Sequence, residues 1–196
     1  MRNVFNFNPG PAVLPEPVLE STSKAVLNFA NTGMSIMEVS HRSKEFDALL
    51  VETESLVAEV MGIPENYKVL FLQGGASLQF SMVPMNLLVD GKTADYIDTG
   101  SWSSKAIKEA QKVGKVNIAA STKGDKYTRI PAPSELKLTP DAVYCHITSN
   151  NTIYGSQWQT FPDTGSVPLV ADMSSDILSR TFDVSKFGII YAGAQK

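Results

Sequence analysis

Residues 167–172 read Val-Pro-Leu-Val-Ala-Asp, an unbroken apolar run that ends in a carboxylate. A strand that is apolar at successive rather than alternate positions is typical of a parallel sheet covered on both faces. Five other short apolar runs also end in polar or glycine-containing residues, and these runs are 69–72, 94–97, 116–119, 143–147 and 187–192. The run that ends at Asp172 therefore predicts one strand of a mostly parallel sheet.

Helical segments alternate with these runs. Residues 76–88 and 103–113 have helical character between expected strands, and Pro84 favours a kinked or short first helix. Two amphipathic helices are expected before them, over 15–31 and over 43–62, with Ser and Gly residues at their ends as caps and stops. Helices that alternate with strands indicate an α/β domain.

The composition is that of an ordinary globular chain. Its 196 residues are 43% hydrophobic and 19% charged, and 17 basic against 20 acidic residues give a net charge of -3. Because the sequence has no dense basic run, it does not favour a surface that binds nucleic acid or an anionic membrane. A small-molecule ligand is favoured instead. The N-terminus has no apolar stretch long enough for a signal peptide, so none is expected. The longest apolar-rich run, 69–89, is too polar to span a bilayer.

The chain has one cysteine and two histidines. They are too few for a four-ligand Cys/His zinc site, and no metal site is expected. Cys145 ends the apolar run 142–145, so a buried, unreactive thiol is favoured over a nucleophile. A lone cysteine cannot form an internal disulfide, which suits a reducing cytoplasm, the location that we expect.

The residues that follow the expected strands are the first candidates for a binding site, because ligands of open α/β sheets collect at the carboxyl ends of the strands. They supply a glycine-rich turn at 73–77, Trp102, a hydroxyl-bearing segment at 148–152, Asp172 and Lys196. Taken singly, each has an ordinary structural explanation, such as a tight turn, core packing, a solvated strand end or a surface lysine. Together they would meet at one edge of the sheet.

This combination of groups suits pyridoxal 5'-phosphate. Backbone amides at the start of a helix after Gly74-Gly75 can bind a phosphate. Asp172 can hold a pyridine nitrogen protonated, which makes the ring an electron sink. Lys196, which follows an apolar strand through small residues, can act as the amine that forms an imine.

Residues 191–196, Tyr-Ala-Gly-Ala-Gln-Lys, resemble the lysine motif of the class V aminotransferases. Stretches at 6–12, 40–43, 71–77 and 146–152 resemble, in the same order, the members of that family that act on phosphoserine. The resemblance implies an α/β fold, the large domain of a fold-type-I pyridoxal-phosphate transferase, with a mostly parallel sheet flanked by helices. It also implies a homodimer.

The resemblance further implies which residues react and which bind the substrate. Lys196 and Asp172 would be catalytic, the lysine through a covalent link to the cofactor and the carboxylate through the pyridine nitrogen. Arg42 would bind a substrate carboxylate, and His41 would lie beside it near the substrate.

The cofactor contacts are implied in the same way. Trp102 would stack on the ring, and Thr152 would form a hydrogen bond with the phenolic oxygen. Ala76, Ser77 and Gln195 would bind the phosphate.

The implied reaction is the reversible exchange of an amino group between L-glutamate with 3-phosphohydroxypyruvate and 2-oxoglutarate with O-phospho-L-serine, in serine biosynthesis. Two alternatives remain open. One is another class V activity, such as a desulfurase, for which Cys145 within a strand is a poor nucleophile. The other is a non-catalytic nucleotide-binding α/β module that uses the Gly74-Gly75 turn.

The expected domain organisation is an N-terminal segment over 1–15 and a large cofactor-binding domain over 16–196. Members of the resembled family continue past their lysine for nearly as many residues again. We therefore expect the large domain to be incomplete and the small C-terminal domain to be absent from this chain.

Overall fold

The computed structural model describes residues 4–89 and 91–194, and the chain divides into two compact units, Met1–Leu70 and Phe71–Lys196. The sequence placed a boundary near residue 15 instead, and that division stays a prediction. Within the described ranges, no helix combines the length and the apolar character needed to cross a membrane.

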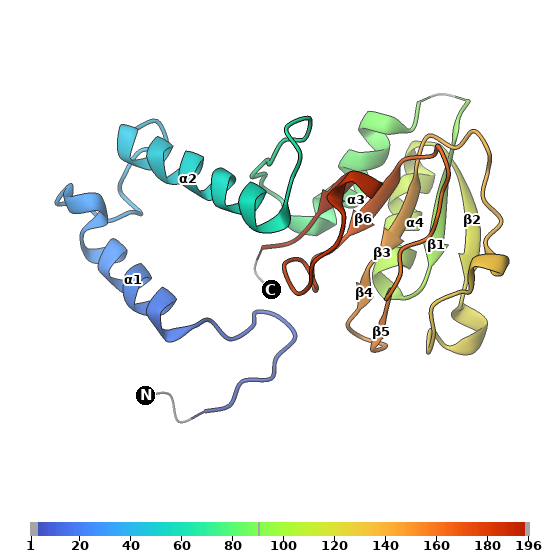
Figure 1. Ribbon diagram of the computed structural model, residues 1–196, viewed down its shortest axis with the longest axis horizontal. Coiled ribbons are helices and arrows are strands. Elements are labelled where there is room, and N and C mark those ends of the chain that lie inside the picture. The colour runs from blue at the N-terminus through green and yellow to red at the C-terminus, as the bar shows by residue number, and fades with distance from the viewer. Residues whose placement is uncertain (1–3, 90, 195–196) are drawn as a thin grey trace. The chain divides into compact units, whose positions relative to one another are not determined.

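The first unit contains the helices α1, Glu16–Leu27, and α2, Lys44–Met61, with the short 3-10 helix Phe29–Asn31 between them (Figure 1). The expected caps of α2 are confirmed. Ser43 Oγ accepts a hydrogen bond from the Phe46 N–H at 3.2 Å, and Gly62 ends the helix in the left-handed region at φ 61°.

The helix α1 ends four residues before the expected limit at residue 31. Asn28 has an extended backbone, and its Oδ1 accepts a hydrogen bond from the Gly33 N–H at 2.8 Å. A side chain that bonds the backbone in this way competes with helix continuation, which explains the earlier stop.

The second unit is built on a five-stranded parallel sheet with the strand order β2-β1-β3-β6-β7 (Figure 1). Its strands are β1 Thr93–Asp98, β2 Lys115–Ser121, β3 Cys145–Thr148, β6 Leu169–Asp172 and β7 Phe187–Tyr191. A small antiparallel hairpin follows β3, formed by β4 Asn150–Asn151 and β5 Ser156–Gln157. Five of the six strands expected from the sequence are thus confirmed.

The strand expected over 69–72 is absent, and that prediction is wrong. No pairing among the described strands includes these residues, and Leu70, Phe71 and Leu72 are exposed. A strand needs a neighbour to receive its backbone hydrogen bonds, and an apolar run does not by itself supply one.

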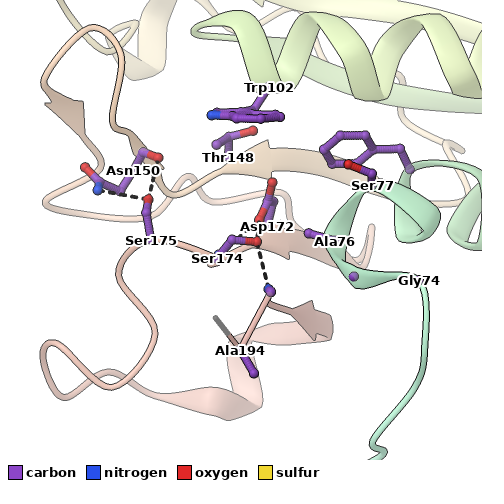
Figure 2. Close-up of a pocket in the computed structure, with 13 residues that line it drawn as sticks. Gly74, Ala76, Ser77, Trp102, Thr148, Asn150, Asp172, Ser174, Ser175 and Ala194 are labelled. Carbon is purple, nitrogen blue, oxygen red and sulfur yellow. Dashed lines mark hydrogen bonds between the residues drawn. The ribbon is translucent and has the colours of Figure 1, made fainter. Parts of the chain in front are cut away.

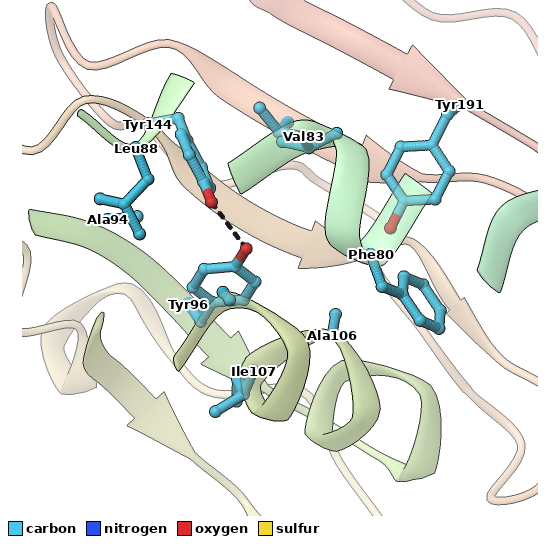
Figure 3. Packing of buried hydrophobic residues seen from close by; sticks show 11 residues of the cluster. Phe80, Val83, Leu88, Ala94, Tyr96, Ala106, Ile107, Tyr144 and Tyr191 are labelled. Atoms are coloured by element: carbon cyan, nitrogen blue, oxygen red, sulfur yellow. Dashed lines mark hydrogen bonds between the residues drawn. The ribbon is translucent and has the colours of Figure 1, made fainter. Parts of the chain in front are cut away.

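The helices α3, Gly75–Leu87, and α4, Ser101–Val113, cover one face of the sheet, where α3 packs on α4 and α4 packs on β1, β2 and β3. Pro84 lies inside α3, which ends three residues later. Figure 3 shows the resulting core, in which Phe80 of α3 and Ile107 of α4 belong to the same buried cluster as Tyr96 of β1, and Tyr96 shares a hydrogen bond with Tyr144.

The other face of the sheet is covered mainly by irregular chain. A second core cluster includes Ile97, Ile147 and Leu169 of the strands, together with Trp158 and Phe187. Three further 3-10 helices lie in this unit, Lys123–Asp125, Pro133–Glu135 and Val184–Lys186. The central strands are therefore buried on both sides, as the unbroken apolar runs predicted.

Candidate active site

A cavity of about 310 Å³ lies at the carboxyl ends of the strands in the second unit (Figure 2). Its walls include the start of α3, residues 74–77, and Trp102 in the first turn of α4. Thr148 and Asp172, the last residues of β3 and β6, also line it, as does Gly193 after β7. The structure thus brings together the start of α3 and residues at or after the ends of four strands, β1, β3, β6 and β7.

The start of α3 has a backbone that favours glycine. Gly74 caps the helix in the left-handed region at φ 88°, and a Cβ atom there would lie 2.3 Å from Leu78 Cδ2. The first-turn N–H groups of a helix lack acceptors within the helix and carry the positive end of its dipole. Ala76 and Ser77, the expected phosphate ligands, lie in this turn, so this end of the cavity suits an anion.

Asp172 brings a buried carboxylate to the same cavity. The residue is 4% exposed, and its Oδ1 accepts hydrogen bonds from the Ser174 N–H at 3.0 Å and from Ser174 Oγ at 2.6 Å. In the sheet it pairs with Thr148 on one side and Tyr191 on the other. A buried carboxylate in a ligand cavity is suited to pair with a cationic group of the ligand.

Trp102 provides a flat apolar wall. Figure 2 shows its ring edge-on beside Thr148 and Asp172. Lys105, one turn further along α4, places its Nζ 4.3 Å from the centre of the ring. The start of α4 is fixed to the end of β1 because Ser103 Oγ and Ser104 Oγ both donate hydrogen bonds to Asp98 Oδ1.

The sequence did not assign roles to Thr148 and Ser174, although both line the cavity. Thr148 Oγ1 is buried and has no hydrogen-bond partner among the described residues. Ser174 bonds to Asp172 and accepts a hydrogen bond from the Gly193 N–H at 3.0 Å. Their position at strand ends is the same signal that identified Asp172, but a lone hydroxyl carries no motif.

A buried histidine lies near the site but outside the lining of the cavity. His146 Nε2 is 2.8 Å from the hydroxyl oxygen of Tyr191, and its ring stacks on Tyr96 with the centroids 4.8 Å apart. Burial lowers the pKa of His146 to about 3 and raises the pKa of Tyr191 well above its usual value. Both groups are therefore neutral at pH 7.

Cys145 matches the expectation from the sequence. It is fully buried in β3, and burial raises the pKa of its thiol to about 12. A neutral, enclosed thiol is a poor nucleophile. Within residues 4–89 and 91–194, no three His, Cys, Asp or Glu side chains are grouped as a metal site.

The structure does not test the other five expected site residues. Thr152 is half-buried in the turn between β4 and β5. His41 and Arg42 belong to the first unit, where both are exposed in the turn before α2. Gln195 and Lys196 fall outside the described residues. The roles assigned to all five stay predictions.

The family model described as Aminotransferase class-V matches residues 4–196. The chain belongs to this family. Among its relatives, the phosphoserine aminotransferase of Desulfosudis oleivorans is 61% identical over 196 residues, and that of Geobacillus kaustophilus is 58% identical. Both alignments cover 100% of this class V chain and 54% of the relative, so the chain spans about half the length of these relatives.

Solved structures agree with this family assignment. A phosphoserine aminotransferase studied for radiation damage of its Schiff base superposes with a TM-score of 0.97 at 56% identity, covering 100% of this chain and 54% of that one. A pyridoxal-phosphate-bound phosphoserine aminotransferase from Trichomonas vaginalis gives 0.90 at 40% identity, covering 99% and 55%. The resemblance and the fold-type-I, mostly parallel sheet expected from the sequence are therefore confirmed.

Proposed function

We propose that the full-length protein is a pyridoxal-phosphate-dependent aminotransferase that acts reversibly on L-glutamate and 3-phosphohydroxypyruvate, giving 2-oxoglutarate and O-phospho-L-serine. The observation that carries the proposal is the presence of a buried carboxylate, Asp172, and a helix N-terminus in one cavity. The choice of substrates is supported by relatives named phosphoserine aminotransferase at 55–61% identity. This reaction would place the protein in serine biosynthesis.

The described residues fit the shape and charges of the cofactor. Its phosphate suits the first-turn amides of α3 and the Ser77 hydroxyl. Its protonated ring nitrogen suits the Asp172 carboxylate, and its flat ring suits Trp102. A ligand in this cavity can also satisfy the buried Thr148 Oγ1.

When bound, pyridoxal phosphate supplies an electron-accepting ring that stabilises negative charge on the substrate α carbon. The chain's own residues make that chemistry effective. Asp172 holds a proton on the ring nitrogen, and the α3 amides fix the phosphate so that the ring keeps its orientation. Trp102 shields a ring face from water, and Lys196 carries the proton to and from the substrate α carbon.

The further assignments rest on the resemblance of their motifs. Arg42 binds a substrate carboxylate through its fork-shaped cation, with His41 beside it. Thr152 contacts the phenolic oxygen of the cofactor, and Gln195 contacts the phosphate. The full-length protein works as a cytoplasmic homodimer on small amino and keto acids.

The test starts with purified full-length protein. We expect it to keep a visible absorbance after added pyridoxal phosphate that is not bound has been removed, and to convert glutamate and 3-phosphohydroxypyruvate. Asp172→Ala should lower kcat/KM by roughly 10³-fold or more, because the ring loses the group that keeps it cationic. Asp183→Ala removes an exposed carboxylate that caps the 3-10 helix Val184–Lys186 and should leave the rate unchanged.

Two results would contradict the proposal in different ways. A colourless protein that takes up no added cofactor would refute the enzyme, whereas near wild-type turnover by Asp172→Ala would refute only the role of Asp172.

A further inference from the structure

Ser174 has a hydroxyl that is engaged on two sides. Its Oγ donates a hydrogen bond to Asp172 Oδ1 at 2.6 Å and accepts one from the Gly193 N–H at 3.0 Å. The backbone N–H of Ser174 donates to the same Oδ1 at 3.0 Å. Figure 2 shows Ser174 beside Asp172, with the bond to the backbone after β7 as a dashed line.

These bonds join two segments that the sheet already brings together. Asp172 ends β6, and its register partner in β7 is Tyr191. The Met173 N–H donates a hydrogen bond to the backbone carbonyl oxygen of Tyr191 at 2.8 Å. One residue beyond this contact, Ser174 Oγ accepts a hydrogen bond from the Gly193 N–H. In the sequence, Gly193 begins the four residues that end at Lys196.

The start of α3 also reaches this point. A Cβ atom built on Gly193 would lie 3.8 Å from the Ala76 nitrogen, from Ala76 Cβ and from Ser174 Oγ. The Ser174 hydroxyl therefore lies where three parts of the cavity meet: the carboxylate of β6, the chain after β7 and the first turn of α3. All three contribute residues to the lining.

Two donors on one carboxylate oxygen restrict rotation of the carboxylate and stabilise its negative charge. We propose that Ser174 is a positioning residue, which fixes the Asp172 carboxylate relative to the chain that carries Lys196. This inference rests on the proposed function, because only that function gives Asp172 a cationic ring nitrogen as its partner. Without the Ser174 hydroxyl, the carboxylate becomes more basic and takes a larger share of that proton.

The consequence for the cofactor has a definite sign. A ring with less positive charge leaves the nitrogen that joins Lys196 to the cofactor more basic. The pH at which the visible absorbance of the bound cofactor changes should therefore rise when the hydroxyl is removed. A residue needed only for folding would lower stability without moving this pH.

The experiment compares full-length wild type with Ser174→Ala and with the pair Ser174→Thr and Ser174→Val, which differ chiefly in the hydroxyl. Pyridoxal phosphate is titrated into cofactor-free protein, and the absorbance of the loaded protein is then followed against pH. We expect Ser174→Ala and Ser174→Val to bind the cofactor at least tenfold more weakly and to show a higher pH midpoint. Ser174→Thr should restore both values most of the way.

Ser185→Ala is the matched control. Ser185 bonds to Asp183 through its N–H at 3.0 Å and its Oγ at 2.6 Å, the same local geometry in an exposed 3-10 helix. It should match wild type in affinity and pH midpoint. If Ser174→Ala does not fold, the Thr and Val variants alone decide the matter.

Unchanged affinity and pH midpoint in the variants that lack the hydroxyl would overturn the role of Ser174 while leaving the proposed function intact. Failure of the wild type itself to bind pyridoxal phosphate would instead refute the proposed function, and the inference with it.

Discussion

Gly74 is the residue of the site at which an added Cβ atom would cause both backbone strain and a steric clash. Its φ of 88° lies in the left-handed region, and a Cβ atom would approach Leu78 Cδ2 to 2.3 Å. Gly165 has a similar backbone, with φ 61°, but nothing lies within 4 Å of its added Cβ. Substitutions at these two glycines therefore distinguish the effect of backbone strain, which both share, from distortion of the start of α3, which only Gly74 would cause.

We expect Gly74→Ala to weaken pyridoxal phosphate binding by at least tenfold, since the first-turn amides must shift to relieve the clash. Gly165→Ala should leave cofactor binding unchanged, although both variants lose about 1 kcal/mol of unfolding free energy from backbone strain. Cofactor titration and urea unfolding measure the two effects. Wild-type cofactor affinity in Gly74→Ala would exclude an anion site at this turn.

Individual residues also show how much of the candidate site could be predicted from the sequence. The strand-end argument placed Asp172 and Trp102 around one cavity, because parallel strands bring their carboxyl ends to one edge. Ser77 lines the same cavity through the start of α3, although the strand expected before it is absent. It gave no role to Thr148 or Ser174. The use of a hydroxyl depends on which atoms the neighbouring strands bring to it, and no local pattern records that.

At the scale of elements, the joint between β1 and α4 holds Trp102 in place. Asp98 ends β1 and is buried, and its two oxygens accept hydrogen bonds from four hydroxyls, those of Ser103, Ser104, Ser121 and Tyr127. These donors come from α4, from the end of β2 and from the chain that follows it. Asp95 is a second buried carboxylate of β1, and it accepts from Asn117 Nδ2 and the Thr139 N–H.

We expect Asp98→Ala and Asp95→Ala each to lower the unfolding free energy by about 2–4 kcal/mol, because each removes a buried acceptor to which at least two groups donate hydrogen bonds. Only Asp98→Ala should also weaken pyridoxal phosphate binding, through movement of the α4 start that carries Trp102. Urea unfolding and cofactor titration distinguish the two variants. Equal loss of cofactor affinity in both would mean that the joint has no specific part in placing Trp102.

Elements were predicted well where the local sequence pattern is clear. The five strands of the sheet could be read from unbroken apolar runs, and α2 from its periodicity and its caps at Ser43 and Gly62. Residues 69–72 have the same apolar character but no strand beside them among the described residues. The sequence of a segment shows whether its side chains favour burial, whereas strand pairing depends on a second segment that is distant in the chain.

At the scale of the whole molecule, His146 reports whether the sheet is covered. It lies on β3, the middle strand of the order β2-β1-β3-β6-β7, and is 1% exposed. Tyr96 stacks on its ring, and the Tyr191 hydroxyl lies 2.8 Å from its Nε2. Only the complete packing of helices and irregular chain on both faces excludes water from this position, and that burial lowers the pKa of His146 to about 3.

This pKa predicts a loss of stability in acid. The unfolded chain binds a proton at His146 near pH 6.5, whereas the folded chain binds it only near pH 3. Between these values the unfolded state binds more protons, so the unfolding free energy falls as the pH decreases, by about 1 kcal/mol per pH unit.

Urea unfolding of the cofactor-free protein from pH 7 to pH 4 should show this slope. His146→Gln should lose most of it, while His41→Gln, which replaces the other, exposed histidine, should retain it. Glu135, whose pKa is lowered to about 2 by Arg129, is common to all three proteins and cancels in the comparison. An identical slope in His146→Gln and wild type would show that the middle of the sheet admits the proton without unfolding.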